Sequence, residues 1–141
     1  MARRRRPLRI TSFADAAGTA FGLRDRFTHA HAVAVLDRHG RVLDLTLFTG
    51  ADHSVDTALG WADCFVFNDE RAERVVLLSA VESRVADGLR ECDLDTLRSA
   101  RKVFGELGVL VVDWLQCDGD DVLSLDLAGD GEGWRRLAPV P

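Results

Sequence analysis

Short runs of mostly apolar residues constrain the fold of this chain more than any other feature of its sequence. They cover residues 31–37, 75–79 and 109–112. Strands that are buried on both faces of a sheet have such a continuous apolar pattern. Between these runs, residues 54–67 and 93–107 carry apolar side chains at the spacing of one helix face. The alternation predicts buried strands that are connected by amphipathic helices.

Turn residues divide the rest of the chain into further elements. A turn at residues 38–40 joins the strand over 31–37 to an alternating segment at 41–48, which predicts a hairpin. Residues 11–28 fit a short helix with Thr11 or Ser12 as its cap, and residues 122–127 alternate as a last strand. The predicted order is (α)ββαβαββ. It corresponds to an α/β (α+β) fold, a mixed β-sheet flanked by helices.

Length and composition predict one globular domain between two tails. The chain has 141 residues, of which 47% are hydrophobic and 29% charged. Such a chain can bury one core, and its composition is not that of a disordered protein. We expect residues 1–10 to form a flexible arginine-rich tail and residues 11–127 a single domain. Residues 128–141 are expected to form a C-terminal tail, with Trp134 as a candidate anchor.

The charge distribution limits the classes of partner. The net charge is −5, although the first nine residues include five arginines and no acid. An acidic body repels phosphate backbones, so the domain itself is not expected to bind nucleic acid broadly. A possible polyanion-binding site remains in the tail, at Arg3, Arg4, Arg5 and Arg6. Its contacts with nucleic acid would be few, salt-sensitive and non-specific.

The cysteines and the apolar runs indicate a compartment. The three cysteines lie far apart and form no CxxC pair, which favours reduced thiols in a cytoplasm over a disulfide framework. No apolar run reaches the ~20 residues of a membrane helix. We therefore predict a cytoplasmic protein without a membrane partner.

Several local strings occur in an order that resembles the JAB/MPN (JAMM) metallopeptidase superfamily, most closely its bacterial RadC-like branch. The resemblance extends over about residues 31–127 and includes the strings Val35–Val42, Leu47–Gly50, Asp93–Val109, Val112–Trp114 and Ser124–Leu125. It implies a JAB-like, cytidine-deaminase-like layering of the sheet and helices. It also implies a cleft in which active members bind zinc through two histidines and a carboxylate, with a glutamate as base.

The ligand positions of that family are largely lost here. Counting back from Asp93, the two histidine positions fall on Ala80 and Glu82, and the serine position falls on Arg90. The glutamate position falls near Leu45, where Asp44 is the acidic neighbour. Trp114 takes the place of a histidine that is common in the family.

The resemblance thus implies a degenerate cleft that holds no catalytic residue, metal or cofactor. Its residues are Asp44, Ala80, Glu82, Arg90, Asp93 and Trp114. The implied function is that of a non-catalytic domain, a pseudoenzyme that acts as a protein interaction or scaffold module. A protein partner or a homodimer is expected, because MPN-type domains often pair with one another. The edge strand and the vacated cleft are the expected surfaces.

Other interpretations of the same residues stay open. His29 and His31 share a strand face if the strand begins at residue 29, which makes them weak metal candidates beside His53 or Asp44. Without a third assured ligand, a structural role is favoured. Asp93 equally suits the N-cap of a helix.

Two further functions remain as alternatives. The chain could be a small hydrolase or another enzyme that uses a cleft site outside the family pattern, with an acid or a cysteine as its reactive group. Plain packing is favoured for Cys64, and no motif accompanies Cys92. The chain could also be a nucleic-acid accessory protein that acts through its arginine-rich N-terminus.

Overall fold

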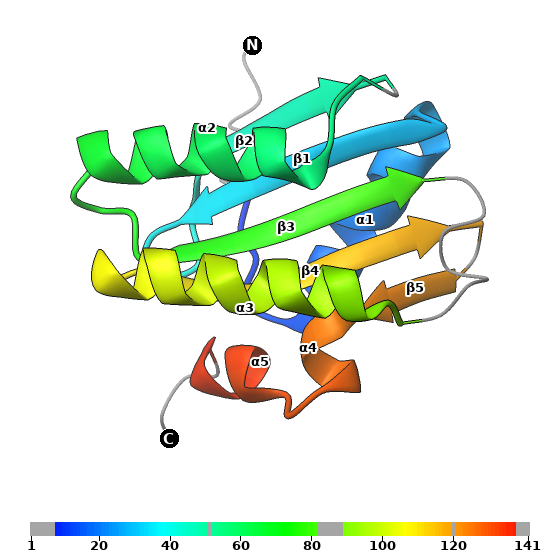
Figure 1. Ribbon diagram of the computed structural model, residues 1–141. Coiled ribbons are helices and arrows are strands. Elements are labelled where there is room, and N and C mark those ends of the chain that lie inside the picture. The colour runs from blue at the N-terminus through cyan, green and yellow to red at the C-terminus, as the bar shows by residue number, and fades with distance from the viewer. Residues whose placement is uncertain (1–7, 51, 82–88, 120, 138–141) are drawn as a thin grey trace, which may run out of the picture.

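The computed structural model describes residues 8–50, 52–81, 89–119 and 121–137 of the chain. These residues form a mixed β-sheet that is flanked by helices, as predicted (Figure 1). The strands are β1 (His29–Leu36), β2 (Val42–Thr49), β3 (Arg74–Val81), β4 (Leu110–Asp118) and β5 (Asp121–Ser124). The helices are α1 (Phe13–Arg26), α2 (Val55–Asn68), α3 (Glu91–Glu106), α4 (Leu125–Ala128) and α5 (Glu132–Leu137).

The strands lie in the order β2-β1-β3-β4-β5, with β1 at the centre of an antiparallel group. It pairs antiparallel with both β2 and β3, whereas β3 and β4 are parallel and β5 is antiparallel to β4. Helices α2 and α3 cover one face of the sheet, and α1 covers the other (Figure 1). The parallel pair follows from the helical crossover between its strands.

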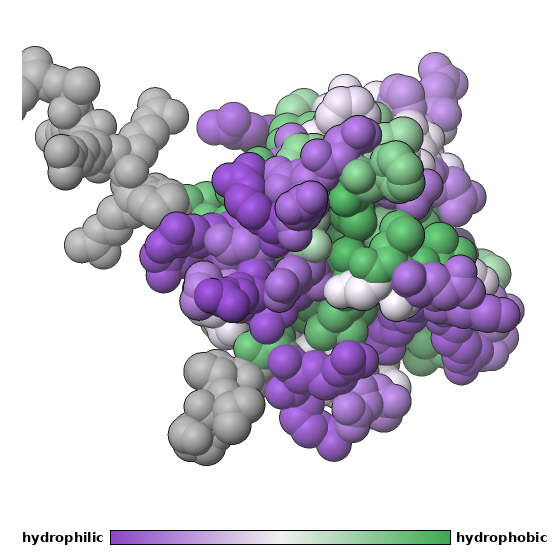
Figure 2. Space-filling view, turned by 90° about the vertical axis from the view of Figure 1, so that its left-hand side faces the viewer, coloured by the Kyte–Doolittle hydropathy of each residue, from purple (hydrophilic) through white to green (hydrophobic). Residues whose placement is uncertain are grey.

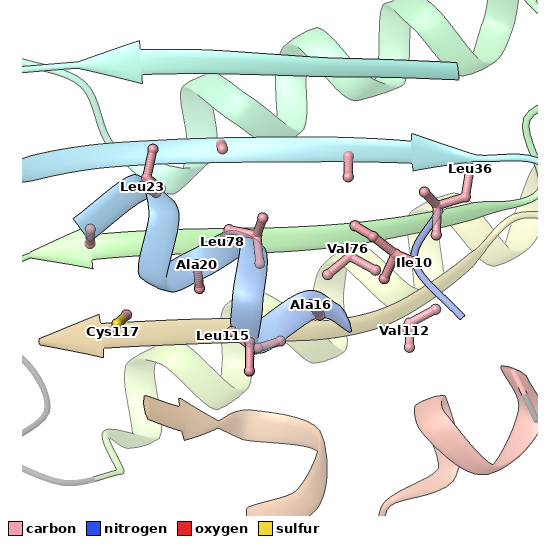
Figure 3. Packing of buried hydrophobic residues seen from close by; sticks show 14 of the residues in the cluster. Ile10, Ala16, Ala20, Leu23, Leu36, Val76, Leu78, Val112, Leu115 and Cys117 are labelled. Carbon is pink, nitrogen blue, oxygen red and sulfur yellow. The ribbon is translucent and has the colours of Figure 1, made fainter. Parts of the chain in front are cut away.

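Each face of the sheet has its own apolar cluster, because side chains alternate along a strand. On the α1 side, the alanines of β1 pack with Leu78 and Leu115 against Ala16, Ala20 and Leu23 of α1 (Figure 3). On the other side, the valines of β1 and the last turns of α3 belong to the second cluster. The central strands are therefore buried on both faces, which explains their continuous apolar sequences.

Local hydrogen bonds define the start of α1. The Ser12 hydroxyl accepts a bond from the backbone N–H of Asp15 at 3.2 Å. In return, the carboxylate of Asp15 accepts bonds from the backbone N–H and hydroxyl of Thr11, both at 3.0 Å. These bonds lower the pKa of Asp15, the Thr11 backbone contributing most. Of the two cap candidates in the sequence, Thr11 and Ser12, Ser12 is therefore the N-cap.

Two elements differ from the sequence-based expectation. Residues 122–127 do not form one strand, because β5 ends at Ser124 and the Ser124 hydroxyl accepts a bond from Leu127 N–H at 3.0 Å, which begins α4. Asp93 is not an N-cap. Helix α3 begins at Glu91 with Arg90 as its cap, and Asp93 lies in the first turn with a buried carboxylate.

The segment expected as a C-terminal tail instead contains α5, and its candidate anchor Trp134 is buried. The Trp134 indole Nε1–H donates to Asp113 of β4 at 2.7 Å. The carboxylate of Asp126 accepts from the backbone N–H of Gly133 at 2.9 Å and from Arg101 at 2.5 Å. We call this set, Arg101, Asp113, Asp126 and Trp134, the carboxylate network. Its hydrogen bonds connect α4 and α5 to β4.

Burial raises the pKa of Asp113, against the opposing effect of the hydrogen bonds that it accepts. Those bonds come from the Ser124 hydroxyl, the Trp134 indole and the backbone N–H groups of Trp114 and Asp126. Both carboxylates of the network are internal, since Asp113 is 0% and Asp126 1% exposed. In the described part of the chain, no helix is both long and apolar enough to cross a membrane.

Candidate functional site

The residues of the predicted degenerate cleft do not all meet. Ala80 is buried in the cluster beneath α1, whereas Trp114 belongs to the cluster on the opposite face. Asp93 contacts the sheet from the first turn of α3. Arg90 is half-buried, and Glu82 lies outside the described residues. Among the described residues of this set, Asp93 and Trp114 lie on the same side of the sheet, and Arg90 caps α3 next to Asp93.

Asp44 occupies a separate position on β2. Its Oδ2 accepts a bond from the Thr46 hydroxyl at 2.6 Å and from the indole N–H of Trp61 at 2.9 Å. Trp61 belongs to α2, so this carboxylate connects the edge strand to the helix above it. The Arg3–Arg6 run, like Glu82, lies outside the described residues.

A buried polar cluster lies where the cleft was expected, and two of its five members, Ser79 and Gln116, were not singled out from the sequence. It consists of His31, Ser79, Asp93, Trp114 and Gln116. Adjacent strands bring the first members together, because His31 pairs with Ser79 across β1 and β3, and Ser79 pairs with Gln116 across β3 and β4. His31 Nδ1 lies 2.6 Å from Ser79 Oγ, and Gln116 Nε2 donates to Asp93 Oδ2 at 2.9 Å.

The geometry around Ser79 limits what this cluster can do. The indole N–H of Trp114 donates to Ser79 Oγ at 2.8 Å, and an indole N–H can only donate. A serine beside a histidine nitrogen is the arrangement of an activated nucleophile. Here, however, Ser79 is 1% and His31 7% exposed. The cluster therefore acts as a set of polar cross-links between β1, β3, β4 and α3.

One atom of the cluster makes no hydrogen bond within the described part of the chain. Gln116 Oε1 is buried and has no hydrogen-bond partner among the described residues. The sequence does carry a signal for this cluster, since Ser79 and Gln116 interrupt the apolar runs of β3 and β4 on the same face. Interrupting polar residues in central strands mark places where a partner is required.

His29 and His31 lie on one face of β1, as the sequence suggested. The strand begins at His29, and the rings of His29 and His31 pack edge to face with centroids 5.2 Å apart. His29 Nε2 lies 3.3 Å from the carbonyl oxygen of His53, whose ring packs on Phe48. In the ranges that the structure describes, no three His, Cys, Asp or Glu side chains lie close enough together to hold a metal.

The cysteines divide into exposed and buried positions. Cys64 is exposed on α2, so the packing role predicted for it is wrong. Cys92 is also exposed, and its Sγ lies 3.8 Å from a carboxylate oxygen of Asp93. Cys117 is buried beneath α1. No pair among them forms a disulfide.

The bare face of β2 is a second candidate surface. Helix α1 packs over β3 and β4, so the β2 side chains beyond Val42 on that face stay exposed. Leu45 and Leu47 are 37% and 45% exposed there, and Leu8 beside them is 48% exposed. A groove of about 380 Å³ runs between these leucines and α1, over Ala32 and Leu78. Large apolar side chains thus gather at one edge of the sheet.

The backbone edge of β2 is also largely open. Residues 8–10 pair with its beginning, where the Val42 N–H donates to the Leu8 carbonyl at 2.9 Å. From residue 43 onwards, β1 is the only described strand that pairs with β2. Natural edge strands often carry lysine or proline that prevents pairing, but β2 contains neither. The opposite edge, β5, is only four residues long and leads directly into α4.

Comparison with known proteins adds no family to this description. No model of a known protein family matches the chain, and no curated protein matches its sequence.

Proposed function

We propose that this chain is a non-catalytic JAB/RadC-like domain that serves as a protein interaction module and pairs with a second copy of itself through β2. The element order α1-β1-β2-α2-β3-α3-β4-β5 supports the fold assignment, as does the position of α1 opposite α2 and α3. The polar cluster at the end of β3 and β4 supports the non-catalytic assignment, because its serine and histidine are buried and bonded.

The open edge and bare face of β2 carry the proposal. Two copies of β2 that pair antiparallel about a two-fold axis centred on Thr46 place Leu45 of one copy opposite Leu47 of the other. The same register places Asp44 opposite Phe48, so like charges do not meet. Asp44 is moreover held by Thr46 and Trp61 on the other face. The four leucines then cover one another, and the backbone groups of the edge find partners.

The test is the oligomeric state of the purified chain over a range of concentrations. Sedimentation equilibrium should give a dimer for the natural sequence, and a monomer for Leu47→Lys, because lysine on an edge opposes pairing. Leu107→Lys is the matched control, since Leu107 is also 45% exposed but lies at the end of α3. It should remain dimeric.

Circular dichroism would show that both variants keep their secondary structure. A natural chain that sediments as a monomer at all concentrations would overturn the proposal. Equal dimerisation of the Leu47 and Leu107 variants would also overturn it, since the contact would then lie elsewhere.

The non-catalytic assignment has its own test. The purified chain should hold no zinc after mild chelation, and added zinc should not produce isopeptidase activity. Stoichiometric zinc that resists chelation would contradict the assignment, because the family's ligand positions hold Ala80 in place of a histidine.

A further inference from the structure

A groove between α2 and α3 lies on the face of the molecule opposite to the bare leucines of β2. Its volume is about 470 Å³. The apolar part of its lining comes from Leu59, Ala100, Val103 and Phe104. Figure 2 views the molecule from the left of Figure 1, and hydrophobic side chains reach the surface on the side of α2 and α3.

Small residues create this groove. Gly60 of α2 and Ala100 of α3 line it, and a Cβ built on Gly60 would meet no atom within 4 Å. Larger apolar side chains stand exposed on the same two helices. Phe67 of α2 is 81% and Val103 of α3 is 51% exposed. A single exposed residue such as Phe67 is ordinary on a surface, but Leu59, Val103 and Phe104 line one groove together, which indicates a binding surface.

The charge at the groove has one sign. Asp56, Asp63 and Asp95 line it, and no lysine or arginine is among its described lining residues. Helix α2 contains no basic residue at all. The Arg98 guanidinium pairs with Asp95 at 3.0 Å, which leaves Asp56 and Asp63 without an ion-pair partner in the described part of the chain. The two carboxylates on α2 therefore give the groove a negative border.

We propose that this groove binds an amphipathic helix of a partner protein, with apolar residues on one face and lysine or arginine at its borders. An apolar floor between two helices accepts such a helix through side chains at i, i+3 or i+4 and i+7. The negative border selects basic flanks and opposes acidic ones. It also opposes an anionic membrane surface, which would otherwise compete for a basic or apolar ligand.

This surface is distinct from the β2 edge, so a dimer joined through β2 would present two such grooves, one on each copy. Groove binding does not depend on the dimer, and the two proposals can fail separately. The monomeric Leu47→Lys variant should bind the partner helix as well as the natural chain does.

The experiment uses the full chain and a pair of synthetic helical peptides. Both carry leucines at helical spacing on one face, and they differ only in lysine or glutamate at the borders. Isothermal titration should show saturable binding of the lysine peptide that weakens with salt, and no binding of the glutamate peptide.

Charge variants locate the site. Asp56→Asn combined with Asp63→Asn should weaken the lysine peptide about tenfold, equivalent to about 1.4 kcal/mol. Glu70→Gln combined with Glu106→Gln is the matched control, because it removes the same charge from exposed positions that do not line the groove. The control should bind as the natural chain does.

Three results would overturn the proposal. The first is that both peptides bind equally well, and the second is that both double variants weaken binding of the lysine peptide equally. The third is that the lysine peptide does not bind the natural chain. Loss of dimerisation alone would not affect it.

Discussion

The substitution Arg101→Ala tests the carboxylate network most directly. The Arg101 guanidinium donates to Asp126 at 2.5 Å and to the carbonyls of Val111 and Val112 at 3.0 and 2.8 Å. The Asp126 side chain is 0% exposed, whereas that of Arg101 is 27% exposed. The substitution therefore leaves a buried carboxylate without its cation.

The expected magnitude follows from burial. Breaking a buried ion pair by removing one partner costs about 3–5 kcal/mol. Water reaches part of the arginine, which favours the lower end, and the lost carbonyl bonds add to the cost. We expect the free energy of unfolding to fall by about 3–4 kcal/mol. That is a large share of the ~5–15 kcal/mol that stabilises a typical domain.

Urea unfolding followed by circular dichroism measures this loss. The matched control is Arg98→Ala on the same helix, where Arg98 pairs with Glu91 and Asp95 on the surface at 3.3 and 3.0 Å. Exposed pairs contribute about 0–1 kcal/mol, so the control should unfold almost as the natural chain does.

A double-mutant cycle separates the charge from the packing. In an Asp126→Asn background, Arg101→Ala should cost clearly less, because no buried charge is left without a partner. Equal losses from the Arg101 and Arg98 variants would refute the reasoning. An Arg101 cost that Asp126→Asn leaves unchanged would also refute it.

Two further predictions concern the same end of the sheet. Gly133→Ala should loosen α5 and lower the melting temperature, because a Cβ there would lie 1.8 Å from the Val112 carbonyl oxygen. A Cβ at Gly18 would meet no atom within 4 Å, so Gly18→Ala should be neutral or stabilising. Equal melting temperatures would contradict this. Burial raises the folded-state pKa of Asp113 above 3.8, so its contribution to stability falls as pH rises from that value through the raised pKa. The stability difference between the natural chain and Asp113→Asn, measured by urea unfolding, should therefore be larger in acid than at neutral pH, and a constant difference would contradict the assignment.

The strands and long helices were predictable because their signals are local. The hairpin turn is one example, since Gly40 has a positive φ of 79° and its N–H bonds to the Asp37 carbonyl at 3.1 Å. Helix α5 was not predictable in this way. Its six residues contain few apolar side chains, and a carboxylate on another element holds its first turn. Such long-range partners leave no periodic pattern in the sequence.

The candidate site shows how sensitive a strand is to register. The resemblance placed a ligand position on Ala80, but neighbouring residues of a strand point to opposite faces. Ala80 therefore packs under α1, and Ser79, one residue earlier, joins the polar cluster. Asp93 and Trp114, which the resemblance assigned to the cleft, belong to the polar cluster, and the sequence did not identify Ser79 and Gln116 as their hydrogen-bond partners. The alternating pattern of β2 showed that its leucines share one face of the strand. The sequence did not show that α1 leaves this face exposed.

The carboxylate network also has a consequence for the order in which the chain can fold during its synthesis. Strand β4 lies at an inner position of the sheet and buries Asp113, yet the donors for that carboxylate include residues that the ribosome adds later, up to Trp134. A nascent chain that has emerged only to the end of β4 would have to desolvate Asp113 without them, which is costly. The sheet should thus gain its full cooperativity only when residues 124–134 have emerged.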